Sequence, residues 1–132
     1  MRKIINLTTI FLIFTFFVLP AFSKRLYREA EYNQKYCSNI GGITEFRNAD
    51  LTRVDCLTKT NAIELDFAEK WAEGVGQALY YSQLTGKKGK LVLILENPDV
   101  EMKYFERAKL LSKVYNFEVE YITPVIFISN YK

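Results

Sequence analysis

The chain has 132 residues and a formal net charge of +3, which falls to +1 without Arg2 and Lys3. This length suits one hydrophobic core rather than two domains, and the small charge gives no strong non-specific attraction to nucleic acid. The chain has no histidine, which excludes Ser-His-Asp and Cys-His catalysis, histidine-ligated zinc and phosphodiesterases with a histidine base.

The first 23 residues have the pattern of a signal peptide. Two basic residues precede an almost uninterrupted apolar run from Ile4 to Phe22, and Ala21-Phe22-Ser23 places small side chains at the positions that a signal peptidase reads. We therefore expect cleavage before Lys24 and export of residues 24–132 as one domain, to the periplasm or the medium. The alternative is an uncleaved anchor, because the run is close to the roughly 20 residues that span a bilayer.

Hydrophobic periodicity predicts an α/β domain after this segment. The predicted elements are a helix within Arg25–Cys37, two strands of a hairpin within Ile43–Leu57, a strand over Ala62–Asp66, a helix from Phe67 to Ser82, a strand over Lys90–Leu95, a helix over Val100–Tyr115 and a strand over Phe117–Ile122. This order, αβββαβαβ, combines an antiparallel meander with a right-handed strand-helix-strand crossover. It predicts a mixed central β-sheet flanked by helices.

Cys37 and Cys56 are the two cysteines of the chain, and export would place them in an oxidising compartment. A bridge between them would close a loop of about 20 residues and stabilise the domain by roughly 3 kcal/mol. Two free buried thiols are the alternative.

Three acidic residues fall on neighbouring strands of the predicted sheet. Asp55 ends the second strand, whereas Glu64 and Asp66 lie two apart in the third and so share one face. Because adjacent strands are roughly 4.8 Å apart, these carboxylates could converge on one divalent cation. Lys70, in the first turn of the next helix, could reach back toward Glu64. Ordinary solvated acidic surface is the alternative.

Gln77 and Tyr81 lie four apart on one face of that helix. With them, the stretch from Thr52 to Ser82 resembles the core of the restriction-endonuclease-like PD-(D/E)XK nuclease superfamily. In that family an acidic residue ends the second strand and a Glu-x-Lys or variant lies in the third, while one branch adds Gln-x-x-x-Tyr in the next helix. Asp55, Glu64 and the Gln77–Tyr81 pair match these positions, and the predicted element order agrees with the core of the family.

The resemblance implies a restriction-endonuclease-like core and a Mg²⁺- or Mn²⁺-dependent nuclease that hydrolyses phosphodiester bonds of nucleic acid, DNA rather than RNA. Asp66 fills the usual lysine position, so Lys70 is the expected substitute. Glu31, or else Glu29, would supply an acid from the first helix, and Arg53 would bind phosphate. The implied catalytic residues are Asp55, Glu64, Lys70, Gln77 and Tyr81, and the implied metal ligands are Asp55, Glu64 and Asp66, with the Leu65 carbonyl as a further candidate.

Two other functions stay open at this stage. One is an exported binding or interaction module that keeps the fold without catalysis, which the small net charge and Asp66 at the lysine position both favour. The other is a different small α/β domain whose carboxylates bind calcium for stability.

Basic and aromatic residues outside this cluster have two interpretations each. Arg47 is a second candidate for phosphate contact, and Lys87, Lys88 and Lys90 form either a basic patch or a solvated turn. Aromatic side chains could stack on the bases of a single strand, although core packing is their commoner role. The aromatic candidates are Tyr80, Tyr104, Phe105 and Tyr115.

Overall fold

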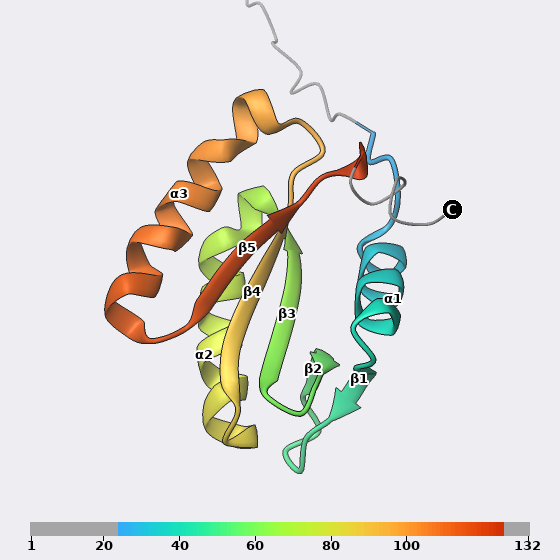
Figure 1. Cartoon of the computed structure of the whole chain (residues 1–132), viewed down its shortest axis with the longest axis vertical. Coiled ribbons are helices and arrows are strands. Elements are labelled where there is room, and N and C mark those ends of the chain that lie inside the picture. The colour runs from blue at the N-terminus through green and yellow to red at the C-terminus, as the bar shows by residue number, and fades with distance from the viewer. Residues whose placement is uncertain (1–23, 126–132) are drawn as a thin grey trace, which may run out of the picture.

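The computed structural model describes residues 24–125, which form one five-stranded sheet with helices packed against it (Figure 1). The elements are α1 (Glu29–Asn39), β1 (Ile43–Arg47), β2 (Arg53–Leu57), β3 (Asn61–Phe67), the 3₁₀-helix η1 (Ala68–Lys70), α2 (Trp71–Thr85), β4 (Lys88–Ile94), α3 (Pro98–Tyr115) and β5 (Glu118–Ile122). The predicted α/β class and mixed, helix-flanked sheet are confirmed. The predicted signal peptide and residues 126–132 of the predicted domain lie outside the described residues.

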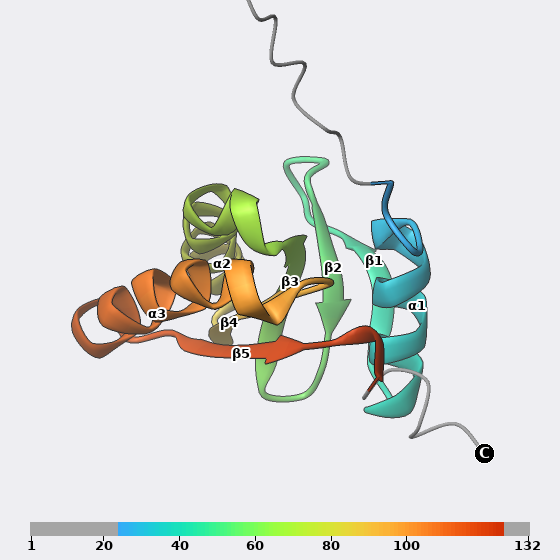
Figure 2. The same cartoon turned by 90° about the horizontal axis from the view of Figure 1, so that it is seen from above.

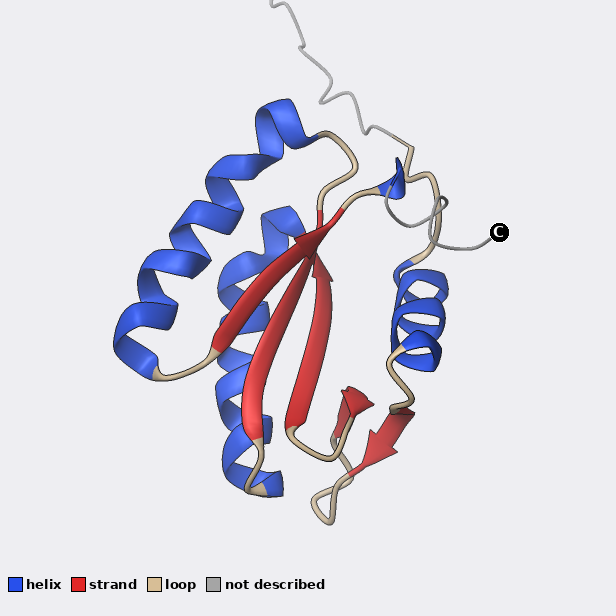
Figure 3. Ribbon diagram, viewed as in Figure 1, coloured by secondary structure: helices blue, strands red, loops and turns tan. Residues whose placement is uncertain are grey.

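The strands lie in the order β1-β2-β3-β4-β5 (Figure 3). The pairs β1–β2 and β2–β3 are antiparallel, whereas β3–β4 and β4–β5 are parallel. Figure 2 shows α2 and α3 together on one face of the sheet, while α1 packs against the end formed by β1, β2 and β3. β3 therefore contacts α1, β2 and α2 as well as β4.

The core is built on β4, whose apolar run is buried on both faces as the sequence predicts. Leu91, Leu93 and Leu95 pack with Val75 and Ala78 in one cluster, and burial of each large aliphatic side chain contributes about 1.5–3 kcal/mol. The apolar positions of α2 therefore pack against β4.

The first helix begins later than predicted. Arg25 does not belong to it, because its guanidinium pairs with Glu69 and lies 4.0 Å from the ring centroid of Phe67. The backbone N–H of Arg28 donates to Glu31 Oε2 at 2.8 Å, which caps the helix at Glu29. The segment after β3 also differs, since η1 precedes α2 there.

The predicted disulfide between Cys37 and Cys56 is confirmed, with a Cα–Cα distance of 5.5 Å, and no cysteine of the described chain is free. It joins α1 to β2. A Cβ on Gly42 would lie 2.4 Å from the Cys56 sulfur, so glycine is required beside the bridge. A disulfide is compatible with an extracytoplasmic location. Within residues 24–125, none of the helices combines the length and the apolar character needed to cross a membrane.

Candidate functional site

The candidate site lies where β2 and β3 diverge. The paired residues of the two strands end at Cys56↔Ile63. Beyond this pair, side-chain carboxylates accept hydrogen bonds from the backbone N–H groups of the opposite strand. The N–H of Leu65 donates to Asp55 Oδ2 at 2.9 Å, and the N–H of Asp55 donates to the Glu64 carboxylate. Backbone hydrogen bonds therefore hold the two acids opposite each other.

The acids of β3 are buried, although their alternation with Ile63 and Leu65 indicated an exposed face. Glu64 is 5% exposed and Asp66 is 4% exposed. The cause is the close approach of α2, in which a Cβ on Gly74 would lie 2.6 Å from Leu91 Cδ1 and 3.6 Å from the Asp66 Cβ. The alternative of an ordinary solvated acidic surface is therefore wrong for β3.

Burial raises the pKa of all three carboxyl groups, and the negative charges of nearby acids add to the rise. The pKa is raised to about 6 for Asp55 and to about 9 for Glu64, where desolvation is the first cause and the charge of Asp55 the second. Desolvation and the charge of Glu29 raise the pKa of Asp66 to about 7, against the lowering effect of Lys70. In the absence of a cation, this cluster therefore retains protons at neutral pH.

One oxygen of this cluster has no partner. Glu64 Oε2 is buried and makes no hydrogen bond within the described chain. An unsatisfied buried carboxylate oxygen is costly. This atom is therefore the most obvious point for a cation or a proton to bind.

Lys70 reaches the cluster from η1. Its Nζ lies 3.4 Å from Asp66 Oδ1 and 3.5 Å from Glu29 Oε2, and the Glu29 and Asp66 carboxyl groups also share a hydrogen bond. The expected contact of Lys70 with Glu64 is replaced by these two. The lysine nevertheless brings a positive charge to the same group of acids.

The acid that the first helix contributes is Glu29. Glu31, the preferred candidate from the sequence, is exposed and bonded to Arg28 at the helix start. It does not reach the cluster, because the helix begins at Glu29 and directs position 31 toward the N-terminal cap. Asn33, one turn after Glu29, also belongs to the site and was missed by the sequence analysis.

Asn33 supports the backbone of Asp55. Its Nδ2 donates to the Asp55 carbonyl at 3.0 Å, and its Oδ1 is buried without a partner in the described chain. The same Nδ2 lies 3.4 Å from Oε1 of Glu45, a residue of β1 whose φ is +54°. Such a backbone conformation costs about 1–3 kcal/mol in a non-glycine residue. The spacing of four residues between Glu29 and Asn33 places both on one face of a helix that packs on a sheet, and this spacing could have identified Asn33.

Gln77 and Tyr81 contact each other on α2, as their spacing predicts. The Gln77 side chain is hydrogen-bonded to the Tyr81 hydroxyl, and desolvation followed by the charge of Glu64 raises the pKa of Tyr81. The Tyr81 ring is buried against Val54 and Leu57. The hydroxyl therefore borders the acidic cluster, while the ring belongs to the core.

The predicted phosphate contacts lie at the edge of the site. Arg53 is exposed and its Nη1 lies 3.1 Å from Glu45 Oε2, so its charge is already paired. Arg47 lies farther along β1, beside Lys87 at a pocket near the end of α2.

The other basic and aromatic candidates divide between core and surface. Lys88 and Lys90 belong to β4 rather than to a turn, and Lys90 Nζ lies 2.8 Å from Glu120 Oε2. Tyr104 and Phe105 pack against the core, whereas Tyr80 and Tyr115 are exposed.

The oxygen atoms of the cluster are of the kind that bind divalent cations, but the side chains do not converge on one position. Within residues 24–125, no group of three or more His, Cys, Asp or Glu side chains has the arrangement of a metal site. Asp55 and Glu64 supply hard oxygen ligands of the kind that Mg²⁺ and Mn²⁺ prefer. Mg²⁺ is usually held by one or two carboxylates and completes its coordination with water, so Asp55 and Glu64 are the two side chains that could supply its carboxylate ligands.

Comparison with known proteins identifies no relative: no family model matches the chain, and neither does a curated protein or a solved structure. The function is therefore inferred from the residues and the geometry of the site.

Proposed function

We propose that this protein is an exported nuclease, dependent on Mg²⁺ or Mn²⁺, with a restriction-endonuclease-like core. The observation that carries the proposal is the pair of half-buried Asp55 and buried Glu64 at the divergence of two strands, with Glu64 Oε2 unsatisfied. Buried acids with raised pKa values in the absence of a counter-charge are a frequent mark of a functional site. The disulfide supports export, since such bonds persist in oxidising compartments.

Asp55 and Glu64 would hold the cation, with the Leu65 carbonyl as a further oxygen. A divalent cation at such a site lowers the pKa of water and offsets the charge that develops on a phosphate. The protein supplies the positions of the ligands, because both carboxylates are fixed by backbone N–H groups. Asp66 is the third acid and pairs with Lys70.

Lys70 would supply the positive charge that the family places two residues after the glutamate. Asp66 and Glu29 hold its ammonium group beside the cluster. There it can orient water by hydrogen bonding or offset negative charge on a phosphate oxygen. Gln77 and Tyr81 border the same cluster and would orient water or the substrate strand.

A binding module without catalysis is the second candidate. It is favoured by the ion pairs of Lys70, which engage Asp66 and Glu29 rather than Glu64. In that case the cluster would be a proton-bearing structural site.

Cleavage assays on the purified, disulfide-bonded protein test the two candidates. Supercoiled, linear and single-stranded DNA and RNA are incubated with Mg²⁺, Mn²⁺ or EDTA, in parallel with Glu64→Gln, Lys70→Ala and the control Glu106→Gln on the exposed side of α3. We expect metal-dependent cleavage, about 10²-fold or more slower in Glu64→Gln and unchanged in the control. Inactivity of a folded protein on every substrate would favour the binding module.

A further inference from the structure

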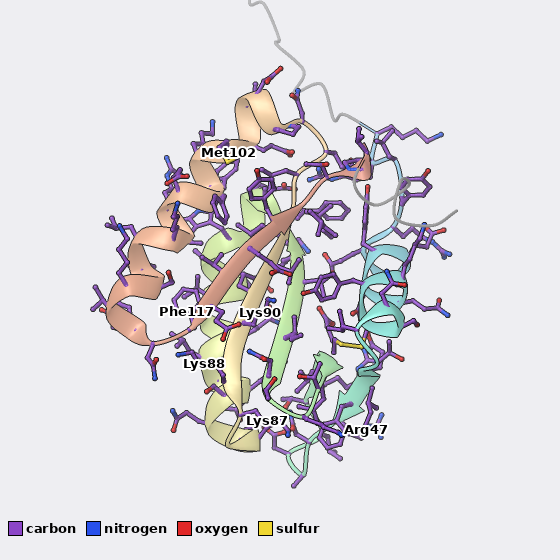
Figure 4. All side chains as sticks on the ribbon, in the orientation of Figure 1. Arg47, Lys87, Lys88, Lys90, Met102 and Phe117 are labelled. Carbon is purple, nitrogen blue, oxygen red and sulfur yellow. A yellow bond between two sulfur atoms is a disulfide. The ribbon has the colours of Figure 1, made fainter. Side chains whose placement is uncertain are left out.

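A cavity lies beside the C-terminal end of α2. It has a volume of about 340 Å³ and opens between this helix end and the β1–β2 turn. Its apolar surface comes from Phe46, Leu57 and Leu84, and Arg47 and Lys87 lie at its edge. Figure 4 shows both basic side chains at the same end of the molecule. The volume lies within the range of about 300–1,000 Å³ that small-molecule pockets occupy.

The wall of the cavity is fixed before any ligand binds. The Tyr80 hydroxyl donates to Asp50 Oδ2 at 2.5 Å and ties the turn to α2. Inside the turn, the Asn48 N–H donates to the Thr52 carbonyl at 2.8 Å, and the Asp50 carboxylate accepts from Thr52. A ligand would therefore enter a preformed space, which reduces the entropy lost on binding.

The charges at the edge are unpaired. No carboxylate of the described chain lies within ion-pair distance of Arg47 or Lys87, whereas Arg53 and Lys90 each have one. The Lys87 ammonium donates to the Lys59 carbonyl at 2.7 Å, which leaves its charge uncompensated. Two unpaired cations beside an apolar surface suit a ligand that joins an anion to a flat apolar ring, as a nucleotide does.

The cavity and the carboxylate cluster both adjoin Tyr81, whose hydroxyl borders the carboxylates. Phe46 and Leu57 pack in the same cluster as Tyr81, and Leu84 follows Tyr81 at a spacing of one turn, a rise of about 5 Å along α2. A nucleic-acid strand that crosses the carboxylates can therefore place a neighbouring nucleotide here.

We propose that this pocket binds the nucleotide next to the scissile phosphate, with its base on Phe46, Leu57 and Leu84 and its phosphate between Arg47 and Lys87. This inference rests on the proposed nuclease function. It gives a protein with a nearly balanced charge and an acidic site two cations with which to hold a polyanion.

Binding in EDTA tests the pocket separately from catalysis. A fluorescein-labelled single-stranded oligothymidylate is titrated with the disulfide-bonded protein at several salt concentrations. The variants are Arg47→Ala/Lys87→Ala and the control Lys103→Ala/Lys113→Ala, which removes the same charge from α3. We expect the first to weaken binding roughly tenfold and to reduce the slope of log K against log salt by about 0.7, as for one phosphate that is no longer neutralised on a single strand. The control should change neither.

A second comparison tests the base. Leu84→Ala should weaken binding of the oligothymidylate by several-fold, yet leave unchanged the binding of an abasic strand of equal length, because the abasic strand offers only phosphates. Weaker binding in Arg47→Ala/Lys87→Ala but not in its control, together with weaker binding of only the base-bearing strand in Leu84→Ala, supports the pocket. This conclusion holds even when the protein cleaves nothing, because absence of cleavage would contradict only the nuclease proposal. Equal loss in the two double variants, or absence of binding by folded protein at low salt, would overturn the pocket.

Discussion

Neutralising Glu64 should stabilise the cation-free protein in a pH-dependent way. Burial raises the pKa of Glu64 from 4.5 to about 9 in the folded state. The folded protein therefore keeps a proton that the unfolded chain releases above pH 4.5, and this difference makes stability fall as the pH rises toward 9. Glu64→Gln removes the titrating group and with it the loss of stability.

The expected size follows from the pKa shift. At pH 7 the solution lies 2.5 pH units above the ordinary Glu64 pKa of 4.5. Each pH unit above that pKa lowers the free energy of unfolding of the wild type by about 1.4 kcal/mol. Glu64→Gln should therefore raise the free energy of unfolding at pH 7 by about 3 kcal/mol. Near pH 4 the gain should vanish, because Glu64 is then protonated in both states. The glutamine also fits, since its Oε1 can accept the Asp55 N–H and its Nε2 can donate to a neighbouring carboxylate.

Urea unfolding from pH 4 to pH 9 measures this difference, with Glu106→Gln on exposed α3 as the control for loss of one charge. Repeating the series with MgCl₂ tests the cation, which stabilises the state that binds it. We expect Mg²⁺ to stabilise the wild type increasingly as the pH rises and to have no such effect on Glu64→Gln. The reasoning would be refuted if Glu64→Gln were no more stable than the wild type at pH 7, or if Mg²⁺ stabilised it as much as the wild type.

Three further perturbations test the fold around the site. Reduction of the disulfide should lower the free energy of unfolding by roughly 3 kcal/mol, measured by urea titration with and without reductant. Gly76→Ala should stabilise α2 by up to about 1 kcal/mol, since the new Cβ would meet nothing within 4 Å. Gly74→Ala should be less stable than Gly76→Ala, because its Cβ would lie 2.6 Å from Leu91 Cδ1. Thermal unfolding of the two variants compares their stabilities. Glu29→Gln should lower the pKa of Asp66 and Glu31→Gln should leave it unchanged, as carboxyl NMR titration would show.

Local patterns in the sequence predicted most of the elements. The spacing of Trp71, Val75 and Ala78 identified α2, and the apolar run ending at Leu95 identified β4, because each pattern reflects burial on one helix face or on both faces of a strand. The single possible cysteine pairing also formed.

The environment of the acids depended on packing that local pattern does not contain. Alternation placed Glu64 and Asp66 on the polar face of their strand, yet α2 covers that face because Gly74 allows a close approach. The choice between Glu29 and Glu31 depended on where the first helix begins, and the cap in which Glu31 accepts from the Arg28 N–H marks that start. The role of Asn33 depended on its contact with the backbone carbonyl of Asp55, 22 positions along the chain.

The order of strands in the sheet has a consequence for how the chain folds. Each strand pairs only with its neighbours along the chain, so no later strand must insert between two that have already paired. Folding can then proceed from the N-terminus as the chain emerges from a ribosome or a translocon, and short loop closures favour a rapid start. Asp55 and Glu64 lie on strands joined by one short turn, so this acidic pair can meet early. The parallel strands and α2, which bury it, must follow later, since their pairing requires longer loops to close.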